Sequence, residues 1–139
     1  DCLPELGAHY PGMGLRDLAR QMMTHLMESR QLARQSEAFS ILPKMEMAPA
    51  EAYQKLVVDE VETLALRDAT GRVAATGLVP YPPGIPLIMP GEHLGSVDDP
   101  FLGYLLALEE WDRKFPGFEH DTHGIEAENG TYRLMVVKE

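Results

Sequence analysis

The stretch PYPPGIPLIMPGE, from Pro80 to Glu92, restricts the possible folds of this chain more than any other. It holds five prolines and two glycines in thirteen positions, and most of its other residues are apolar. Each proline fixes φ and removes a backbone donor, so the stretch does not suit a sheet interior. A solvated linker would not carry so many apolar side chains. We therefore expect a stiff loop that turns at Gly84, runs extended, and turns again at Gly91 to present Glu92.

Two interpretations of this loop follow from the residues alone. The structural one is a crossover that covers a sheet edge. The functional one is a rigid element that places Tyr81 or Glu92 at an interface or a pocket mouth, because a proline-rich segment holds one shape at low entropic cost. The residues favour the structural interpretation and leave the functional one open. The loop is shaped by Pro82, Pro83, Gly84, Pro86, Pro90 and Gly91.

Length and charge limit the classes of function. A chain of 139 residues can form one domain with its own core. Its net charge of −10 argues against a nucleic-acid partner, and no apolar run is long enough to span a membrane. The single cysteine, Cys2, forms no internal disulfide, which favours a reducing, cytoplasmic location. The start at Asp1, without a methionine or a secretion leader, suggests a piece of a longer polypeptide.

Apolar residues recur at steps of three and four from Leu15 onwards. This spacing predicts one amphipathic helix that runs to about Arg34. The methionines on its apolar face favour core packing over a cofactor-binding stripe, because methionine adapts to irregular gaps. Residues 1–14, before this helix, are expected to be irregular.

Prolines mark the starts of two further helices. Pro49 suits a first helical turn, and Pro100 follows Asp98 and Asp99, either of which can cap a helix. We expect the last helix to end before Pro116. Its buried stripe is predicted to consist of Phe101, Leu105, Leu108, Trp111 and Phe115.

Strands are predicted from Val61 to Leu64 and, after a turn at Thr70-Gly71, from Val73 to Val79. The tail is typical of a hairpin, because Asn129-Gly130 is a strong two-residue turn signal. Helices and strands are mixed without a regular βαβ repeat. We therefore predict an α+β fold: one compact domain with about three helices, a small mixed or antiparallel sheet and a C-terminal hairpin.

Few residues suggest chemistry. His120 and His123 have the spacing of two metal ligands, but glycines flank them and no third ligand is obvious, so a loop hydrogen-bond network is favoured. The acidic groups at 98–99, 109–110 and 126–128 are interpreted as solvated faces rather than acid–base pairs. Cys2 has no activating histidine beside it. We therefore assign no catalytic, cofactor-binding or metal-binding residue.

Several long stretches together resemble one family. They are SEAFSILPKMEMAPAEAYQKLV, GRVAATGLVPYPPGIP, LVPYPPGIPLIMPGE, FPGFEHDTHGI and GTYRLMVVKE. The chain, from about Leu15 to Glu139, resembles the C-terminal domain of the bacterial ornithine/lysine/arginine decarboxylases. These are large pyridoxal-phosphate enzymes of the aspartate-aminotransferase fold. The stretch FEHDTHG differs from the Phe-Glu-Thr-Asp-Ile-His-Gly of some members.

The resemblance implies that the cofactor is held in a larger central domain, on a lysine of a Ser-x-His-Lys motif. No such motif occurs here, and the four lysines lack its context. This fragment alone is therefore expected to bind no pyridoxal phosphate and to be inactive. The parent enzyme would release CO2 from arginine, lysine or ornithine, with the cofactor as electron sink, and would serve acid resistance and polyamine supply.

The resemblance also implies partners. The domain would pack on the catalytic domain of the same chain, within a parent that forms dimers or decamers. We expect it to help wall the substrate channel, with Glu92 as the leading candidate and Tyr81 beside it, because carboxylates favour a cationic substrate. The competing hypothesis is a non-enzymatic interaction module whose proline-rich loop docks a partner.

Overall fold

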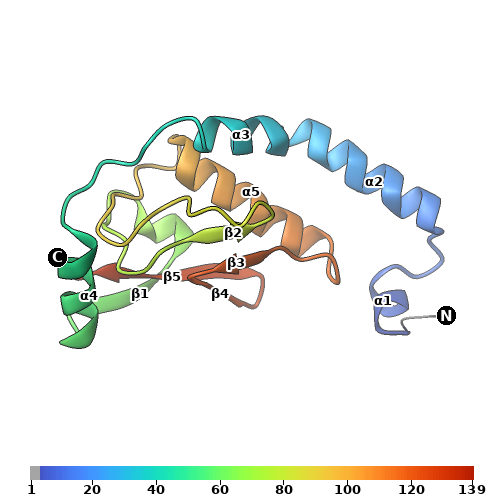
Figure 1. Ribbon diagram of the computed structural model, residues 1–139. Coiled ribbons are helices and arrows are strands. Elements are labelled where there is room, and N and C mark those ends of the chain that lie inside the picture. The colour runs from blue at the N-terminus through green and yellow to red at the C-terminus, as the bar shows by residue number, and fades with distance from the viewer. Residues whose placement is uncertain (1–3) are drawn as a thin grey trace.

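The computed structural model describes residues 4–139 (Figure 1). Its α-helices are α1 (Pro4–His9), α2 (Leu15–Glu28), α3 (Gln31–Ala38), α4 (Pro49–Val57) and α5 (Pro100–Lys114), with a short 3₁₀ helix, η1 (Leu66–Ala69). Its strands are β1 (Val61–Ala65), β2 (Val79–Tyr81), β3 (Asp121–His123), β4 (Ile125–Glu128) and β5 (Thr131–Val137). Cys2 lies outside the described residues. Within residues 4–139, no helix is both long and apolar enough to cross a membrane.

The strand β5 is the centre of a three-stranded antiparallel sheet with the order β1-β5-β4. Thr63 of β1 lies opposite Met135 of β5. The turn between β4 and β5 is made by Asn129 and Gly130, whose φ angles of 51° and 74° are both left-handed, as an Asn-Gly hairpin turn requires. The predicted α+β class and C-terminal hairpin are therefore confirmed. Of the two predicted kinds of sheet, mixed or antiparallel, the antiparallel one is found, and the number of helices is larger than expected.

The helix α5 lies against this sheet and supplies the middle of the core (Figure 1). Leu102, Leu105 and Leu108 are completely buried, and they belong to one cluster with Leu134 and Val136 of β5. The helix begins at the predicted proline and ends before the predicted Pro-Gly. The apolar stripe read from the sequence is therefore confirmed as the core face, although Trp111 remains partly exposed.

Two acidic residues of this region differ from the sequence predictions, which placed Glu109 on a solvated face and let Asp98 or Asp99 cap the helix. Glu109 is only 3% exposed, and its Oε2 accepts the Tyr132 N–H at 2.8 Å, so this carboxylate joins α5 to the start of β5. Asp99 stands at the cap position of α5, but it accepts hydrogen bonds from the backbone and hydroxyl of Ser96 instead. These bonds lower the pKa of Asp99. The remaining acids are exposed as predicted: Asp98, Glu110, Glu126 and Glu128.

The predicted helix from Leu15 to Arg34 is wrong, because the chain breaks it into α2 and α3. Arg30, just before α3, has a left-handed φ of 53° and turns the chain there. Neither proline nor glycine stands at the break, so the sequence carries no usual signal for it. The expectation that residues 1–14 are irregular is also corrected, since Pro4–His9 form α1.

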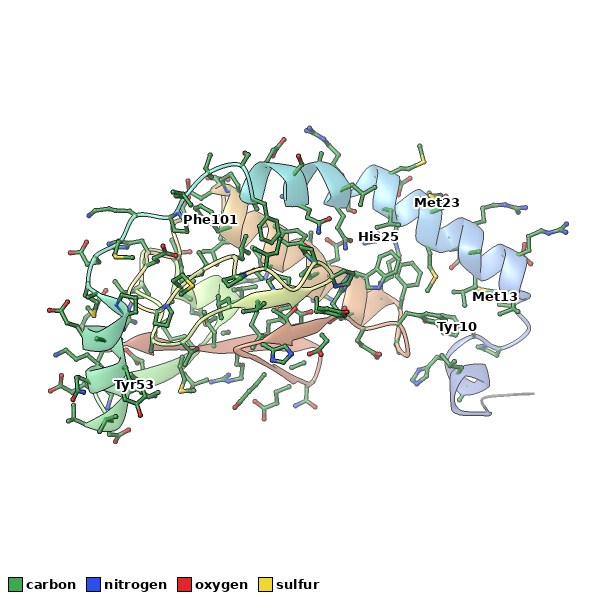
Figure 2. The ribbon with its side chains drawn as sticks, viewed as in Figure 1. Tyr10, Met13, Met23, His25, Tyr53 and Phe101 are labelled. Carbon is green, nitrogen blue, oxygen red and sulfur yellow. The ribbon has the colours of Figure 1, made fainter. Side chains whose placement is uncertain are left out.

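The methionines of α2 do not fill the core as predicted. Met23 and Met27 are 59% and 73% exposed, and Leu15 is 85% exposed. Only Leu18 and His25 of this helix are buried. Figure 2 shows Met23 on the outer side of α2 and His25 on the side that faces the rest of the domain. The helical period identifies an apolar face, but it does not say what covers that face.

The predicted strand from Val73 to Val79 is also wrong. Val73 and Ala74 each make a single bridge to a different segment, and regular pairing begins only at Val79, where β2 pairs with β3. The chain bends between these points, close to the β3–β4 connection. A Cβ on Gly124 would lie 2.1 Å from the Gly77 carbonyl oxygen, so the two backbones meet closely at this bend.

Replacing Glu109 by alanine should weaken this α5–β5 junction, because the Tyr132 N–H would lose its buried acceptor. We expect the free energy of unfolding to fall by about 2–3 kcal/mol. Urea unfolding followed by the fluorescence of Trp111, the single tryptophan, measures the loss. Glu110→Ala, at the exposed neighbouring position, should change stability by less than about 0.5 kcal/mol. Equal losses in both variants would contradict the role of Glu109.

Candidate functional site

The second half of the proline-rich loop is part of the core. Leu87 N donates to the Leu78 carbonyl at 2.8 Å, and Leu78 N donates to the Ile88 carbonyl at 2.9 Å. Leu87 is 4% exposed and Ile88 is fully buried. Further on, Gly91 N donates to the Ala74 carbonyl at 2.8 Å. This half of the loop is thus held against residues 72–78 by backbone hydrogen bonds, despite its prolines.

The first half of the loop is an exposed tip. Residues 81–86 are all exposed, and the Tyr81–Pro82 and Pro82–Pro83 peptide bonds are both cis. Gly84 N donates to the Pro80 carbonyl at 2.9 Å and closes the tip. With a φ of 76°, Gly84 lies so close to the Tyr81 ring that a Cβ would come within 2.9 Å of it. The tip therefore presents Tyr81, which is 60% exposed, and Ile85 to the surroundings.

Glu92 lies at the other end of the loop and has an internal partner. It is 8% exposed, and its Oε2 accepts the Met89 N–H at 2.7 Å, which closes the second turn. Gly91 in that turn has a φ of 88°, and a Cβ there would lie 2.2 Å from the Met47 carbonyl oxygen. Among the described residues no hydrogen bond joins Glu92 to Tyr81. The loop therefore separates the two candidate residues, with Tyr81 on the tip and Glu92 at the base.

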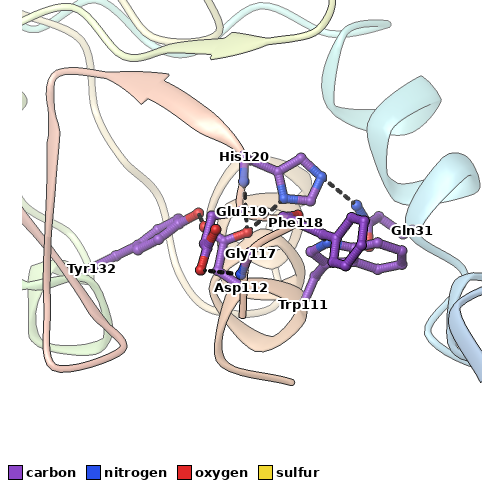
Figure 3. A network of polar contacts seen from close by, with 8 residues as sticks. All are labelled: Gln31, Trp111, Asp112, Gly117, Phe118, Glu119, His120 and Tyr132. Atoms are coloured by element: carbon purple, nitrogen blue, oxygen red, sulfur yellow. Dashed lines mark hydrogen bonds and ion pairs between the residues drawn. The ribbon is translucent and has the colours of Figure 1, made fainter. Parts of the chain in front are cut away.

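The histidine pair of HDTH is also divided. His120 enters a polar network in which its Nδ1 lies 2.8 Å from Asp112 Oδ1 and its Nε2 lies 3.2 Å from Gln31 Nε2 (Figure 3). A neutral imidazole with its proton on Nδ1 satisfies both partners. His123, by contrast, is exposed and faces Asp121 at 3.6 Å. The predicted loop hydrogen-bond network is confirmed for His120.

The same network keeps the Tyr132 hydroxyl protonated. Its hydroxyl donates to the second oxygen of Asp112 (Figure 3). Burial, and then this hydrogen bond to the carboxylate, raise the pKa of Tyr132 well above its ordinary value. The phenol therefore remains a donor, and Asp112 ties together α5, β5 and the segment that leads into β3. In residues 4–139, no group of three or more His, Cys, Asp and Glu side chains is arranged to hold a metal ion.

Each of the four lysines contacts another group of the protein. A lysine that carries this cofactor must present its amine to the bound group. Here every lysine ammonium is engaged by a protein acceptor. The partners are Glu46 for Lys44, Glu60 for Lys55, the His25 ring for Lys114 and the Asp59 carbonyl for Lys138. None of these contacts places a lysine amine at a site for the cofactor, and no step of its chemistry is assigned to the described residues.

Sequence reasoning missed two exposed apolar surfaces. The first lies on the outer side of α2 and continues to Leu32, which is 68% exposed. The second surrounds the end of α4, where Tyr53, Val57 and Val58 are each about 60% exposed (Figure 2). Exposed apolar area of this kind is typical of surfaces that meet other protein. The apolar face of α2 was visible in the sequence, but it was assigned to the core.

Comparison with known proteins identifies the class. The family model of the Orn/Lys/Arg decarboxylase C-terminal domain matches residues 32–138, and the chain belongs to this family.

Relatives and solved structures agree. The chain is 44% identical over 140 residues to the biodegradative arginine decarboxylase of Escherichia coli K12, covering 98% of the chain and 18% of that protein. It is 40% identical over 147 residues to lysine decarboxylase LdcA of Pseudomonas aeruginosa, covering 100% of the chain and 20% of that protein. The structure of the E. coli constitutive lysine decarboxylase matches with a TM-score of 0.88 and 39% identity, over 99% of this chain and 20% of that one. The chain therefore spans about a fifth of the length of these relatives.

Proposed function

We propose that this chain is the C-terminal domain of a pyridoxal-phosphate-dependent decarboxylase of basic amino acids, and that its own role is not catalytic. The family match to residues 32–138 carries the proposal. The relatives are named as decarboxylases of arginine, lysine or ornithine. The engaged lysines support assigning the cofactor to another part of a cytoplasmic parent enzyme. The parent would release CO2 and an amine, and would contribute to acid resistance and polyamine supply.

The parent enzyme should release CO2 from one of these amino acids. The measurement uses the complete parent protein with pyridoxal phosphate at about pH 5–6, near the range in which histidine titrates. Arginine, lysine and ornithine are supplied separately. Release from one of them names the substrate. No release from any of the three would contradict the proposed function and would favour the alternative below.

The loop is the proposed contribution of this domain to the substrate channel. Tyr81 stands on a rigid, exposed tip, which suits a residue that borders a passage. Glu92 sets the shape of the loop base through its bond to Met89 N, and its charge adds to the negative field of a chain with a net charge of −10. Such a field raises the local concentration of a cationic substrate. We thus propose that Tyr81 borders the substrate passage. Glu92 positions the base of the loop, and its charge attracts the cationic substrate.

Glu92→Gln in the parent enzyme separates these effects. The amide oxygen of glutamine still accepts the Met89 N–H, so the loop keeps its shape while the charge is lost. We expect KM for the basic amino acid to rise about two- to fivefold at low ionic strength, and the difference to shrink in salt. Glu128→Gln, which removes an exposed charge from β4, is the matched control. An unchanged KM in Glu92→Gln would remove this residue from the channel.

Assembly is the second proposed role. The exposed apolar residues of α2 and α4 suit contacts with the catalytic domain of the same chain and with further copies in a dimer or decamer. The negative charge opposes association until protons are bound. We therefore expect the sedimentation coefficient of the parent to increase as pH falls from about 8 to 5, where histidines gain protons. A coefficient independent of pH over this range would contradict the idea.

The alternative is a non-enzymatic interaction module that docks a partner through the loop tip. The exposure of Tyr81 and Ile85, 60% and 54%, favours it. It predicts that the parent releases no CO2 from any basic amino acid, so the activity measurement above decides between the two.

A further inference from the structure

A cavity of about 220 Å³ lies where the start of α3, the helix η1 and the first half of α5 meet. None of the residues proposed for the substrate channel borders it. This volume is below the range of about 300–1,000 Å³ usual for drug-sized ligands, so its occupant would be small. The polar lining is contributed by Ser29, Arg34, Arg67 and Glu110, and the apolar wall by Val97 and Leu106.

Two guanidinium groups from distant parts of the sequence converge on this cavity. Arg34 is anchored by its Nε, which donates to the Ser29 carbonyl at 3.0 Å, and its Nη1 lies 3.5 Å from the Gly103 carbonyl. Gly103 makes room for it, because a Cβ there would lie 3.2 Å from Arg34 Nη1. Arg67 is largely exposed, and its Nε lies 4.0 Å from the buried Glu109 carboxylate. Among the described residues, these contacts leave Nη2 of Arg34 and both Nη groups of Arg67 for a ligand.

Ser29 borders this wall, but its hydroxyl does not face the ligand. The Oγ is buried without accessible surface and makes no hydrogen bond among the described residues. The groups that can reach a ligand in the cavity are therefore the two guanidinium groups and the Glu110 carboxylate.

The charges around the cavity restrict the class of ligand. Arg34 and Arg67 favour an anionic group, and a carboxylate matches the planar guanidinium with paired hydrogen bonds. Glu110 on the rim and Glu109 behind Arg67 oppose a phosphate, which carries up to two negative charges. A zwitterion complements both the positive and the negative charges of the cavity, with its carboxylate at the arginines and its ammonium at Glu110. Val97 and Leu106 then cover a short aliphatic side chain.

We propose that this cavity, the Arg34–Arg67 site, binds a free α-amino acid as its zwitterion. The ligand carboxylate is held by the two guanidinium groups, and the ammonium by Glu110. The site is separate from the loop that carries Tyr81 and Glu92, and it does not depend on the decarboxylase function of the parent.

The test uses ligand-observed NMR titration of the full-length parent enzyme with L-norvaline, an aliphatic amino acid without a basic side chain. We expect Arg34→Gln and Arg67→Gln each to weaken the binding of norvaline about tenfold, as the loss of a charged hydrogen-bonding partner implies. Arg16→Gln, at an exposed arginine of α2, should bind as the unmodified enzyme does. Norvaline bound at an active site elsewhere in the parent would contribute equally to all three variants. Unchanged binding in both cavity variants would overturn the proposal.

A second variant tests the zwitterion without disturbing the fold. Glu110 is exposed, so Glu110→Gln should leave the structure intact and remove only the partner of the ammonium. We expect the unmodified enzyme to prefer norvaline to butyrate, which lacks the ammonium, and Glu110→Gln to lose most of this preference. Equal preference in both enzymes, or binding of inorganic phosphate in competition with norvaline, would overturn the assignment to an amino acid. The CO2 measurement is independent of either result.

Discussion

The packing of α5 on β5 is the contact on which the rest of the domain depends. Leucines of the helix meet Leu134 and Val136 of the strand, and Glu109 adds a buried hydrogen bond to Tyr132 at the strand's start. Both neighbouring strands, β1 and β4, pair with β5 and not with each other. The end of α5 carries Asp112, which organises the network around His120. A change that separates this helix from this strand would therefore affect the sheet and the network together.

The features proposed to have a function lie around this core and are held by it. The proline-rich loop is built in two halves, a buried base that pairs through Leu78 and Ile88 and an exposed tip that carries Tyr81. The Arg34–Arg67 site depends in the same way on α5, whose Gly103 makes room for a guanidinium. The outer face of α2 is different, because nothing in the described residues covers it. A chain that spans about a fifth of its relatives is expected to leave such surfaces to the rest of the parent.

The sequence predicted those elements that have strong local signals. Prolines and the Asn-Gly pair marked the start of α5 and the hairpin, and the apolar stripe of α5 indicated the core. The break at Arg30 was missed because its left-handed backbone occurs without glycine or proline. Glu109 was assigned to solvent because its role depends on a strand 23 residues later in the chain. The Arg34–Arg67 site could not be found either, since its residues come from three separate elements and match no motif.

The break at Arg30 has a mechanical consequence. A helix of 14 residues is about 21 Å long, so α2 would act as a lever, with this break as its pivot, if the chain turned there. A rotation of about 10° at the pivot would displace the Leu15 end by about 3–4 Å over that length. The ring of His25, set between α2 and the aromatic rings of Trp111 and Phe115, lies close to the pivot. A small shift of the His25 ring against Trp111 and Phe115 would thus produce a larger displacement at the far end of α2, where the chain enters from α1.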